Sequence, residues 1–425
     1  MHYYKRIYDS VHGFIYFSSL EKDLIDSYAF QRLHYLRQVG VAYLVYPGAT
    51  HSRFQHSLGV MHIATQIFDQ MMRNYEQPLE PSFHTYFRQI IRFASLCHDL
   101  GHLPFSHTAE EIVLGEGGHE KWTLDLIESS LLRPIWDRFR LDFPDKNVVE
   151  DIVKMSLGEE KLSSIRKEKV LFTQWEHVLS QVITGDFFGA DRIDYLLRDA
   201  RCTGVSYGLF DYQQLIETLR ILPFNSKLTL GNEENGMESC EALLLARHFM
   251  HRRVYQYPSV KAYSFHMARF IKYLYKQEKP LVSLEKYLSY TDNEILSHLR
   301  IAFSDPSHPV HEDALALFGK EQRYLAFDVV GTLDLKDVEA WKGRFQVQEE
   351  ELKIFVVEKK QASLFSFPVL SRNQKIIDSK SCFSISIPSH STSWIYVSPK
   401  YKDSIKDLLD KYPLEKNESL NNAKN

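Results

Sequence analysis

The sequence has few cysteines, no long apolar run and no excess of basic residues. Its 425 residues include only four cysteines, Cys97, Cys202, Cys240 and Cys382, which lie far apart with no CxxC pair. This pattern excludes a disulfide-dense scaffold and is typical of a reducing compartment. No stretch reaches the roughly 18 apolar residues that a membrane helix needs, and the N-terminus lacks an apolar signal core. We therefore predict a cytoplasmic protein that does not bind a membrane.

The charge balance limits how the chain could hold a polyanion. It has 51 Lys and Arg against 55 Asp and Glu, for a formal net charge of −4. No overall basic field is present to gather nucleic acid, so we do not expect a nucleic-acid partner. A polyanionic ligand would have to bind at a local cationic cluster. The 19 histidines are numerous, and histidine serves metal binding and proton transfer near neutral pH.

The hydrophobic pattern predicts a mainly α-helical protein. Hydrophobic residues make up 44% of the chain, which is enough for a large core, and the length allows one to three domains. Residues 222–232 predict a short β-hairpin between two helices. Apolar residues at helical spacing predict helices over 24–39 (ending at Gly40), 53–75, 82–98, 120–130, 148–156, 174–200, 210–220, 237–257 and 260–277.

Beyond residue 280 the pattern changes from helical periodicity to short β-rich runs. We therefore divide the chain into a helical core over 1–280 and a smaller α+β region over 281–415. The polar tail, 416–425, is expected to be disordered. Within the α+β region we expect helices at 293–303 and 402–411 and strands at 353–358 and 383–387.

The strongest local signal is the run His98-Asp99-Leu-Gly-His102-Leu-Pro-Phe-Ser-His107, directly after an apolar helix. Buried imidazoles and carboxylates cost free energy unless they are paired or bind a metal. Taken alone, these histidines could simply interact with the negative end of the helix dipole and have no role in catalysis. His56 on a buried helix and the polar stripe that begins at Asp191 also have ordinary structural explanations, as a core histidine and a solvated face.

Together these blocks resemble the HD superfamily of metal-dependent phosphohydrolases, and more closely its dNTP triphosphohydrolase branch. The resemblance covers roughly residues 3–275. It implies an HD-domain helical core that hydrolyses deoxynucleoside triphosphates to deoxynucleoside and inorganic triphosphate. The further blocks that carry it are Asp9-Ser-Val-His-Gly, Phe30-Gln-Arg-Leu, Tyr46 to Gly59, His119-Glu120, Ala190 to Tyr195 and His251 to Gln256.

The resemblance also assigns a metal site and catalytic residues. It implies one divalent metal ion per active site, with Mn, Fe, Zn, Ni and Mg all compatible with two imidazoles and two carboxylates. The implied ligands are His56, His98, Asp99 and Asp191. His107 is the implied general acid for the departing 5′ oxygen, supported by Glu110, where the vertebrate relative has Asp. His102 and His119 match residues that contact the phosphates.

Further positions match substrate contacts of the family. Arg192 replaces a Lys of the vertebrate relative and so keeps the charge but offers a planar fork of donors. The implied phosphate contacts are Arg53, Arg192, Tyr195 and Arg247; Gln38 and Asp199 match contacts to the 3′-hydroxyl, Tyr255 the residue that excludes a 2′-hydroxyl, and His251 and Gln256 residues near the base.

The family also implies partners. We expect a homo-oligomer, a dimer or tetramer, with a nucleotide activator bound between subunits. Lys5 and Asp26 match residues of a guanine-specific activator site, whereas His34 replaces an expected Arg and Tyr8 an expected Asn. Activation, if it occurs, is therefore expected to differ from the vertebrate scheme.

Two other hypotheses stay open at this point. One is an HD-type phosphohydrolase or phosphodiesterase acting on another nucleotide or phosphate compound. Hydrolases of guanosine tetraphosphate usually carry a Glu-Asp pair after the His-Asp, whereas this chain has Gly101-His102-Leu-Pro. The other is a non-catalytic nucleotide sensor or nucleic-acid-binding scaffold, which the loss of a metal ligand would favour; none of the four is lost.

Overall fold

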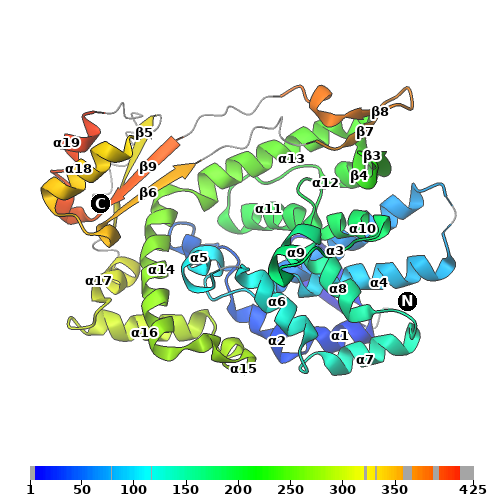
Figure 1. Cartoon of the computed structure of the whole chain (residues 1–425), viewed down its shortest axis with the longest axis horizontal. Helices are drawn as coiled ribbons and strands as arrows, with labels where there is room; N and C mark the ends of the chain where they lie inside the picture. The colour runs from blue at the N-terminus through cyan, green and yellow to red at the C-terminus, as the bar shows by residue number, and fades with distance from the viewer. Residues whose placement is uncertain are drawn as a thin grey trace.

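The structure is a computed structural model that describes residues 5–77, 79–115, 117–319, 323–330, 333–357, 366–385 and 392–411. Helices make up most of it, and a three-stranded sheet lies at one end (Figure 1). The predicted fold class, a helical core with a short hairpin and a smaller α+β C-terminal region, is confirmed. No helix in these ranges is long and apolar enough to cross a bilayer.

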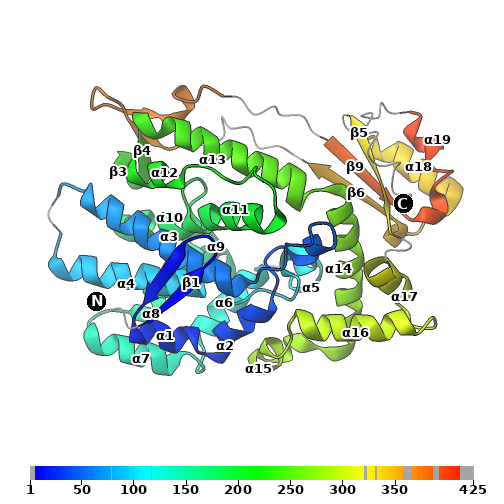
Figure 2. The same cartoon turned by 180° about the vertical axis from the view of Figure 1, so that it is seen from behind.

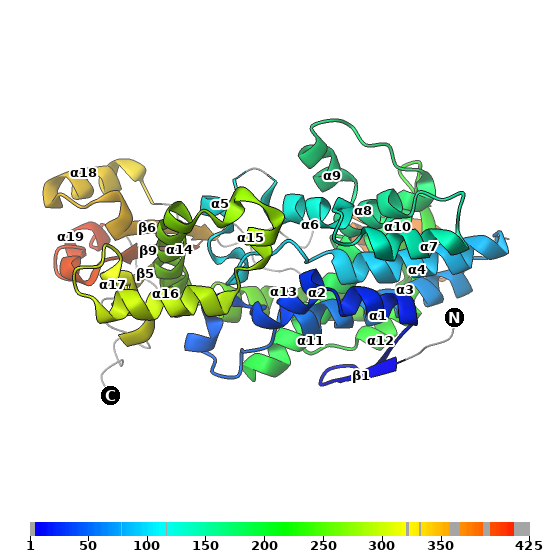
Figure 3. The same cartoon turned by 90° about the horizontal axis from the view of Figure 1, so that it is seen from below.

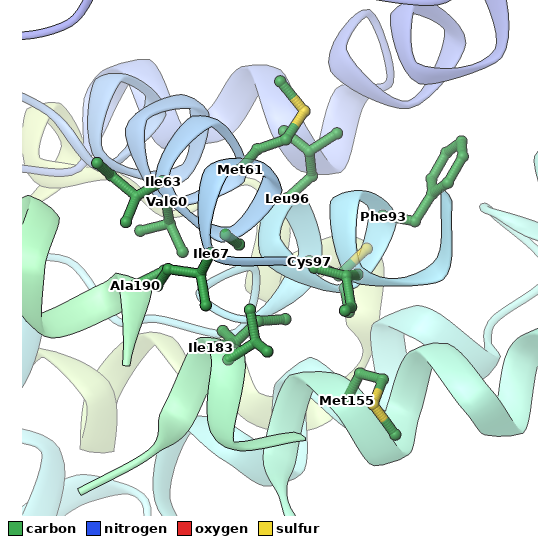
Figure 4. Close-up of a cluster of buried hydrophobic side chains, with 14 of the residues drawn as sticks. Val60, Met61, Ile63, Ile67, Phe93, Leu96, Cys97, Met155, Ile183 and Ala190 are labelled. Atoms are coloured by element: carbon green, nitrogen blue, oxygen red, sulfur yellow. The ribbon is translucent and has the colours of Figure 1, made fainter. Parts of the chain in front are cut away.

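Five helices form the centre of the core. They are α3 (Arg53–Arg73), α4 (Pro81–Cys97), α8 (Val148–Leu157), α10 (Gln174–Thr184) and α11 (Ala190–Thr203). α3 packs against α4, α10 and α11 and is buried on several sides, as its two apolar stripes predict. Figure 4 shows Val60 and Ile67 of α3 with Cys97 of α4 and Ile183 of α10. Burying each large side chain of this kind contributes about 1.5–3 kcal/mol.

Further helices precede the C-terminal sheet in the chain. They are α1 (Ser19–Ile25), α2 (Tyr28–Gln31), α5 (Glu110–Val113), α6 (Gly118–Glu128), α7 (Arg133–Asp142), α9 (Glu159–Arg166), α12 (Tyr212–Glu217), α13 (Met237–Met250), α14 (Pro258–Glu278), α15 (Leu284–Leu288), α16 (Asp292–Ser304) and α17 (His311–Ala314). In Figures 1 and 3, α14 stands between the helical centre and the three-stranded sheet.

Residues 24–39 do not form the single helix that their apolar spacing predicts. The chain instead makes α1, then α2, then a 3₁₀ turn over Arg32–Tyr35. The break follows from Ser27, whose hydroxyl accepts a hydrogen bond from the backbone N–H three residues on, at 3.3 Å, and so starts a new helix. Gly40 was expected to end the helix; it has a φ of +54° and begins a 3₁₀ segment instead.

Two other predicted helices are interrupted. The helix expected over 174–200 is divided into α10 and α11, because Gly185 and Gly189 adopt an extended backbone with ψ of 136° and 135°. The helix expected over 237–257 ends as α13 and continues as a π-helix over His251–Tyr255. A π-helical turn of this kind occurs frequently at functional sites.

Two hairpins border the helical core. Figures 2 and 3 show the first, β1 with β2, at the surface of the molecule. The hairpin predicted at 222–232 is confirmed as β3 with β4. A C-terminal segment extends its sheet in the order β3-β4-β7-β8, a pairing that the sequence did not predict. The strands are β1 (Lys5–Asp9), β2 (Gly13–Phe17), β3 (Leu219–Phe224), β4 (Lys227–Glu233), β7 (Pro368–Leu370) and β8 (Ile376–Asp378).

The C-terminal sheet has its own apolar core. Its order is β5-β9-β6, and Trp341 and Leu408 pack with Ile395. The strand expected at 383–387 is wrong for its described residues, 383–385, which are not in a strand. The helix expected at 402–411 shortens to α19. The elements are β5 (Leu325–Val330), β6 (Leu352–Val357), β9 (Thr392–Val397), α18 (Leu335–Phe345) and α19 (Lys406–Leu409).

The predicted boundary at residue 280 stays a prediction. One apolar cluster contains residues from both sides of it, including Ile271 and Tyr287. The expected disordered tail, 416–425, lies outside the described residues.

Candidate metal centre

The structure brings together the four predicted metal ligands from three helices. His56 lies on α3, His98 and Asp99 follow the last residue of α4, and Asp191 lies in the first turn of α11. His56 Nε2 is 3.1 Å from Asp191 Oδ1 and 3.6 Å from Asp99 Oδ2. His98 Nε2 is 3.5 Å from Asp99 Oδ1 and 3.8 Å from Asp191 Oδ1. Two atoms that bind one ion at about 2.1 Å lie roughly 3.0 to 4.2 Å apart, from neighbouring to opposite positions, so these four spacings are compatible with a shared cation.

The two imidazoles present open ligand positions. His56 Nδ1 bonds to Asp194 Oδ2 at 2.8 Å, and His98 Nδ1 donates to Ser95 O at 2.7 Å. The Nε2 atom of each ring is buried and has no hydrogen-bond partner of good geometry among the described residues. Buried polar atoms are nearly always satisfied. Two orphaned nitrogens beside two carboxylates therefore fit a divalent metal ion.

The electrostatics of the site favour a cation. Burial alone would lower the pKa of His56, but the carboxylates of Asp191 and Asp194 raise it to about 10. Burial opposes ionisation of Asp191, yet the imidazoles of His56 and His98 hold its pKa below the usual range. The Asp191 side chain is 40% exposed, whereas Asp99 is buried, and His98 and Arg53 keep the pKa of Asp99 well below the usual value. The carboxylates are therefore ionised at neutral pH and available as ligands.

A buried ion network holds His56 in place, and the sequence analysis gave its members no role. Asp194 accepts from His12 Nε2 at 2.6 Å and from Arg198 Nε at 2.9 Å, and Arg198 Nη1 donates to Asp9 Oδ2 at 2.7 Å. Asp9, His12 and Asp194 appeared in the sequence only as parts of the blocks Asp9 to Gly13 and Ala190 to Tyr195, and Arg198 only in the polar stripe that begins at Asp191. The Asp194 carboxylate fixes the tautomer of His56, as outer partners of metal-bound histidines commonly do.

This network depends on the close approach of α3 and α11 at Gly59. A Cβ at that position would lie 1.9 Å from Asp194 Oδ1 and 2.4 Å from Arg198 Nη2. We predict that Gly59→Ala lowers the free energy of unfolding by about 3 kcal/mol or more, because overpacking here also displaces buried ions. Gly343→Ala is the control, since a Cβ in that exposed helix meets nothing within 4 Å and should stabilise by about 0.5–1 kcal/mol. Thermal or urea unfolding measures both; equal small effects would contradict this packing.

A second histidine cluster adjoins the first. Glu110 bridges two imidazoles, with Oε2 at 2.6 Å from His107 Nδ1 and Oε1 at 2.5 Å from His119 Nδ1. His102 stacks on His119 with ring centroids 3.6 Å apart, and its Nε2 is 3.3 Å from Asp99 Oδ1. The His107 side chain is 67% exposed, whereas His102 is buried. Burial and Arg53 hold the pKa of His102 well below its usual value, so this ring is neutral at pH 7.

Residues beyond the predicted boundary at 280 support the loop between these clusters. Tyr287 OH donates to Gly101 O at 2.5 Å, and Arg32 Nη1 donates to His102 O at 2.9 Å. Asp292 accepts from Phe105 N at 2.8 Å and from Arg37 N at 2.9 Å. Phe105 has a φ of 58°, a conformation that a non-glycine residue adopts only when its surroundings fix it.

The residues predicted to contact the sugar lie together. Asp199 accepts from Tyr255 OH at 2.6 Å through Oδ2 and bonds to His51 Nε2 at 2.7 Å through Oδ1. Burial opposes a charge on His51, but Asp199 raises its pKa to about 9, so this imidazole is protonated at neutral pH. Gln38 N donates to His51 O at 3.0 Å, and Gln38 Oε1 is buried without a partner among the residues that the structure describes. His51 was missed by the sequence analysis, because its contact with Asp199 spans 148 positions.

Of the predicted phosphate contacts, Arg192, Arg247 and Tyr195 form a cationic group, whereas Arg53 lies beside Asp99. Arg53 pairs with Asp99 and donates to Ser106 Oγ at 2.9 Å. Arg192 is near Arg247 and Tyr195, and its Nε and Nη1 are buried with no partner in the described parts of the chain. Buried donors of this kind fit an anionic ligand.

The residues predicted near the base lie beside this group. Burial lowers the pKa of His251 to about 4, with further lowering by Arg247 and Arg192. The His251 and Tyr255 ring centroids are 5.2 Å apart. Gln256 follows the π-helix, where its backbone N donates to His251 O at 2.8 Å.

The residues matched to an activator site are distributed over the N-terminal elements. Lys5 opens β1, and Asp26 ends α1, where it pairs with Lys22. His34, in place of the expected Arg, stacks on Phe54 with ring centroids 3.6 Å apart. Tyr8, in place of the expected Asn, is 71% exposed.

Comparison with known proteins identifies the class. The HD domain family matches residues 53–177, and the HD associated region matches 210–313. A hypothetical protein from Aquifex aeolicus with a known crystal structure is 31% identical with a TM-score of 0.74, covering 95% of this chain and 99% of that one. The chain therefore belongs to the HD-domain superfamily of phosphohydrolases.

Individual relatives include an uncharacterized protein and a named enzyme. An uncharacterized protein of Methanocaldococcus jannaschii is 34% identical over 299 residues, covering 70% of this chain and 55% of that protein. The deoxynucleoside triphosphate triphosphohydrolase SAMHD1 of Bos taurus is 30% identical over 271 residues, covering 60% and 44%. The chain thus spans about half the length of these curated relatives. A phosphohydrolase structure from Bacteroides thetaiotaomicron, 20% identical with a TM-score of 0.71, supports the fold alone.

Proposed function

We propose that the protein hydrolyses deoxynucleoside triphosphates to deoxynucleoside and inorganic triphosphate, with a divalent metal ion held by His56, His98, Asp99 and Asp191. The observation that carries the proposal is the pair of buried, unpartnered Nε2 atoms that faces two ionised carboxylates. The neighbouring cationic group and the Asp199–Tyr255 pair support a triphosphate bound to a sugar. The relation to the SAMHD1 triphosphohydrolase supports the same substrate class.

The mechanism assigns each group a step. A divalent ion supplies Lewis-acid polarisation of a phosphoryl oxygen and a nucleophilic water at neutral pH. Arg192 and Arg247 bind the triphosphate and offset its charge. As water attacks the α-phosphorus, the bond to the 5′ oxygen breaks and His107 donates a proton to that oxygen. Glu110 holds His107 Nδ1 at 2.6 Å, which leaves Nε2 to face the substrate.

Asp199 and Tyr255 explain a preference for the deoxyribose. Each carboxylate oxygen has two lone pairs, so Asp199 can accept from a 3′-hydroxyl while it keeps its bonds to His51 and Tyr255. The Tyr255 ring, fixed by its hydroxyl, fills the place where a 2′-hydroxyl would project. A ribonucleotide would clash with this ring through its 2′-hydroxyl. A deoxynucleotide lacks that hydroxyl and therefore fits.

The direct test is a panel of dNTPs and NTPs with Mn, Mg or Fe and with activator nucleotides present. Chromatography should separate triphosphate from pyrophosphate and phosphate. We expect triphosphate and deoxynucleoside in equal amounts, with dNTPs preferred. Release of pyrophosphate or phosphate instead would move the protein to another branch of the superfamily, and no turnover of any nucleotide would reject the proposal.

His51 is expected to position Asp199 for the sugar. We predict that His51→Gln raises the KM for dNTPs about tenfold with little change in kcat, because a charge-assisted hydrogen bond worth about 1.5–3 kcal/mol is lost. A 2′,3′-dideoxynucleotide lacks the recognised hydroxyl, so the variant and the unmodified protein should use it equally well. His84→Gln, at an exposed site on α4, is the matched control. An equal loss with both substrates would show that His51 only stabilises the fold.

We also propose that the chain forms a homo-oligomer, with a nucleotide activator between its subunits. The hairpin β1–β2 supports this, because it exposes Tyr8, Phe14 and Tyr16 together, at 71%, 44% and 44%. Exposed apolar groups gathered on one face mark interaction surfaces. Sedimentation of the protein tests the homo-oligomer, and its change on addition of nucleotide tests the activator between the subunits.

A further inference from the structure

The second histidine cluster has the composition of a metal site in its own right. One nitrogen or carboxylate oxygen from each of His102, His107, Glu110 and His119 lies within 4.8 Å of the other three. Glu110 already contacts two of the imidazoles, at 2.6 and 2.5 Å. His102 is only 1% exposed, and its Nδ1 has no hydrogen-bond partner in the described ranges. A buried, unpaired imidazole nitrogen beside three other potential ligands points to an occupant that supplies the missing bond.

We propose that this cluster is an inhibitory zinc site, separate from the HD centre. Three imidazoles and one carboxylate are a ligand set that Zn²⁺ takes in tetrahedral geometry at about 2.0–2.2 Å, whereas Mg²⁺ prefers oxygen ligands and water. Ligands of such an ion lie about 3.4 Å apart, so the cluster must contract by roughly 1 Å. The exposed His107 side chain can make that movement, because its ring is 67% accessible to solvent.

The two sites would adjoin without sharing a ligand. His102 turns Nε2 toward Asp99 at 3.3 Å and keeps Nδ1 for the second cluster. Zinc bound at His107 would occupy the imidazole that must donate a proton to the 5′ oxygen. It would also bind the Glu110 carboxylate, which otherwise holds that imidazole in place. Hydrolysis would then stop while the HD centre stays loaded. This consequence for activity rests on the proposed function, but the binding of zinc does not.

The experiment is a titration of the metal-free, full-length protein with Zn²⁺, followed by equilibrium dialysis and by the visible absorption of Co²⁺ as a substitute. We expect two equivalents for the unmodified protein and one for Asp191→Asn, which loses only the HD centre. His107→Gln and His119→Gln should each weaken the second equivalent by at least about tenfold. His107 is exposed, so its variant should fold even if replacing His119 does not. His84→Gln should bind as the unmodified protein does.

Activity gives a second, independent measurement. With the HD centre loaded by Mn²⁺, added Zn²⁺ should abolish triphosphate release along the binding curve of the second equivalent. A single equivalent in the unmodified protein, or a second one that His107→Gln and His119→Gln leave unchanged, would overturn the zinc site. Two equivalents in a protein that releases no triphosphate with Mn²⁺ even before zinc is added would support the zinc site and reject the proposed hydrolase. Triphosphate release by a protein that binds only one equivalent of zinc would support the proposed hydrolase and reject the zinc site.

Discussion

Asp191→Asn is expected to remove the bound metal ion and to lower triphosphate release by at least about 10³-fold. Asp191 Oδ1 lies 3.1 Å from His56 Nε2 and 3.8 Å from His98 Nε2, so it is within reach of an ion that both imidazoles bind. An amide has the same shape but no charge, and metal catalysis of this kind is worth several kcal/mol, where each 1.4 kcal/mol is tenfold in rate. Elemental analysis of the dialysed protein and initial rates measure the two effects.

The matched control is Asp142→Asn, at an exposed position at the end of α7. It should keep both the metal and the rate. If Asp191→Asn kept one tightly bound metal ion at the HD centre and full activity, the assignment of Asp191 as a ligand would be wrong. A variant that lost metal but kept its rate would show that the reaction does not use the ion.

His107→Gln is expected to lower triphosphate release by about 10²–10⁴-fold while the protein keeps the metal at the HD centre. Proton donation to the 5′ oxygen is the step that the imidazole performs, and Gln cannot donate a proton in this way. The side chain is 67% exposed, so its replacement should not unfold the protein. Initial rates, together with the metal content after loading with Mn²⁺, test both statements.

A substrate that needs no proton on its leaving group separates this role from others. For a nitrophenyl ester at the α-phosphorus, the same variant should lose less than about tenfold, because the nitrophenolate departs unprotonated. His84→Gln again serves as the control. An equal loss with both substrates would assign His107 to binding and not to proton transfer.

The sequence predicted the features that depend on local pattern. The helical periodicity placed α3 and α4 correctly, and it failed where a single residue overrides it, as Ser27 does by starting a new helix. The glycines at 185 and 189 divide a predicted helix for a related reason, since both adopt extended backbone. Residues that form one site but lie on different helices were connected only through the family resemblance.

Contacts between distant parts of the chain were not predictable from spacing. His12 meets Asp194 across 182 positions, and Arg32 reaches Tyr290 O across 258. Asp292, beyond the predicted boundary, holds the loop that carries His107 through its bond to Phe105 N. Each of these residues is charged or polar and buried, and a sequence alone does not show which distant partner satisfies it.

The central claim is that two imidazoles and two carboxylates bind one metal ion. A crystal structure of the protein loaded with one equivalent of Mn²⁺, with anomalous scattering measured at the metal edge, tests it most directly. We predict a single peak about 2.0–2.3 Å from Nε2 of His56, Nε2 of His98 and a carboxylate oxygen of Asp99 and of Asp191. A peak bound by other residues, with these four side chains left without metal, would contradict the account.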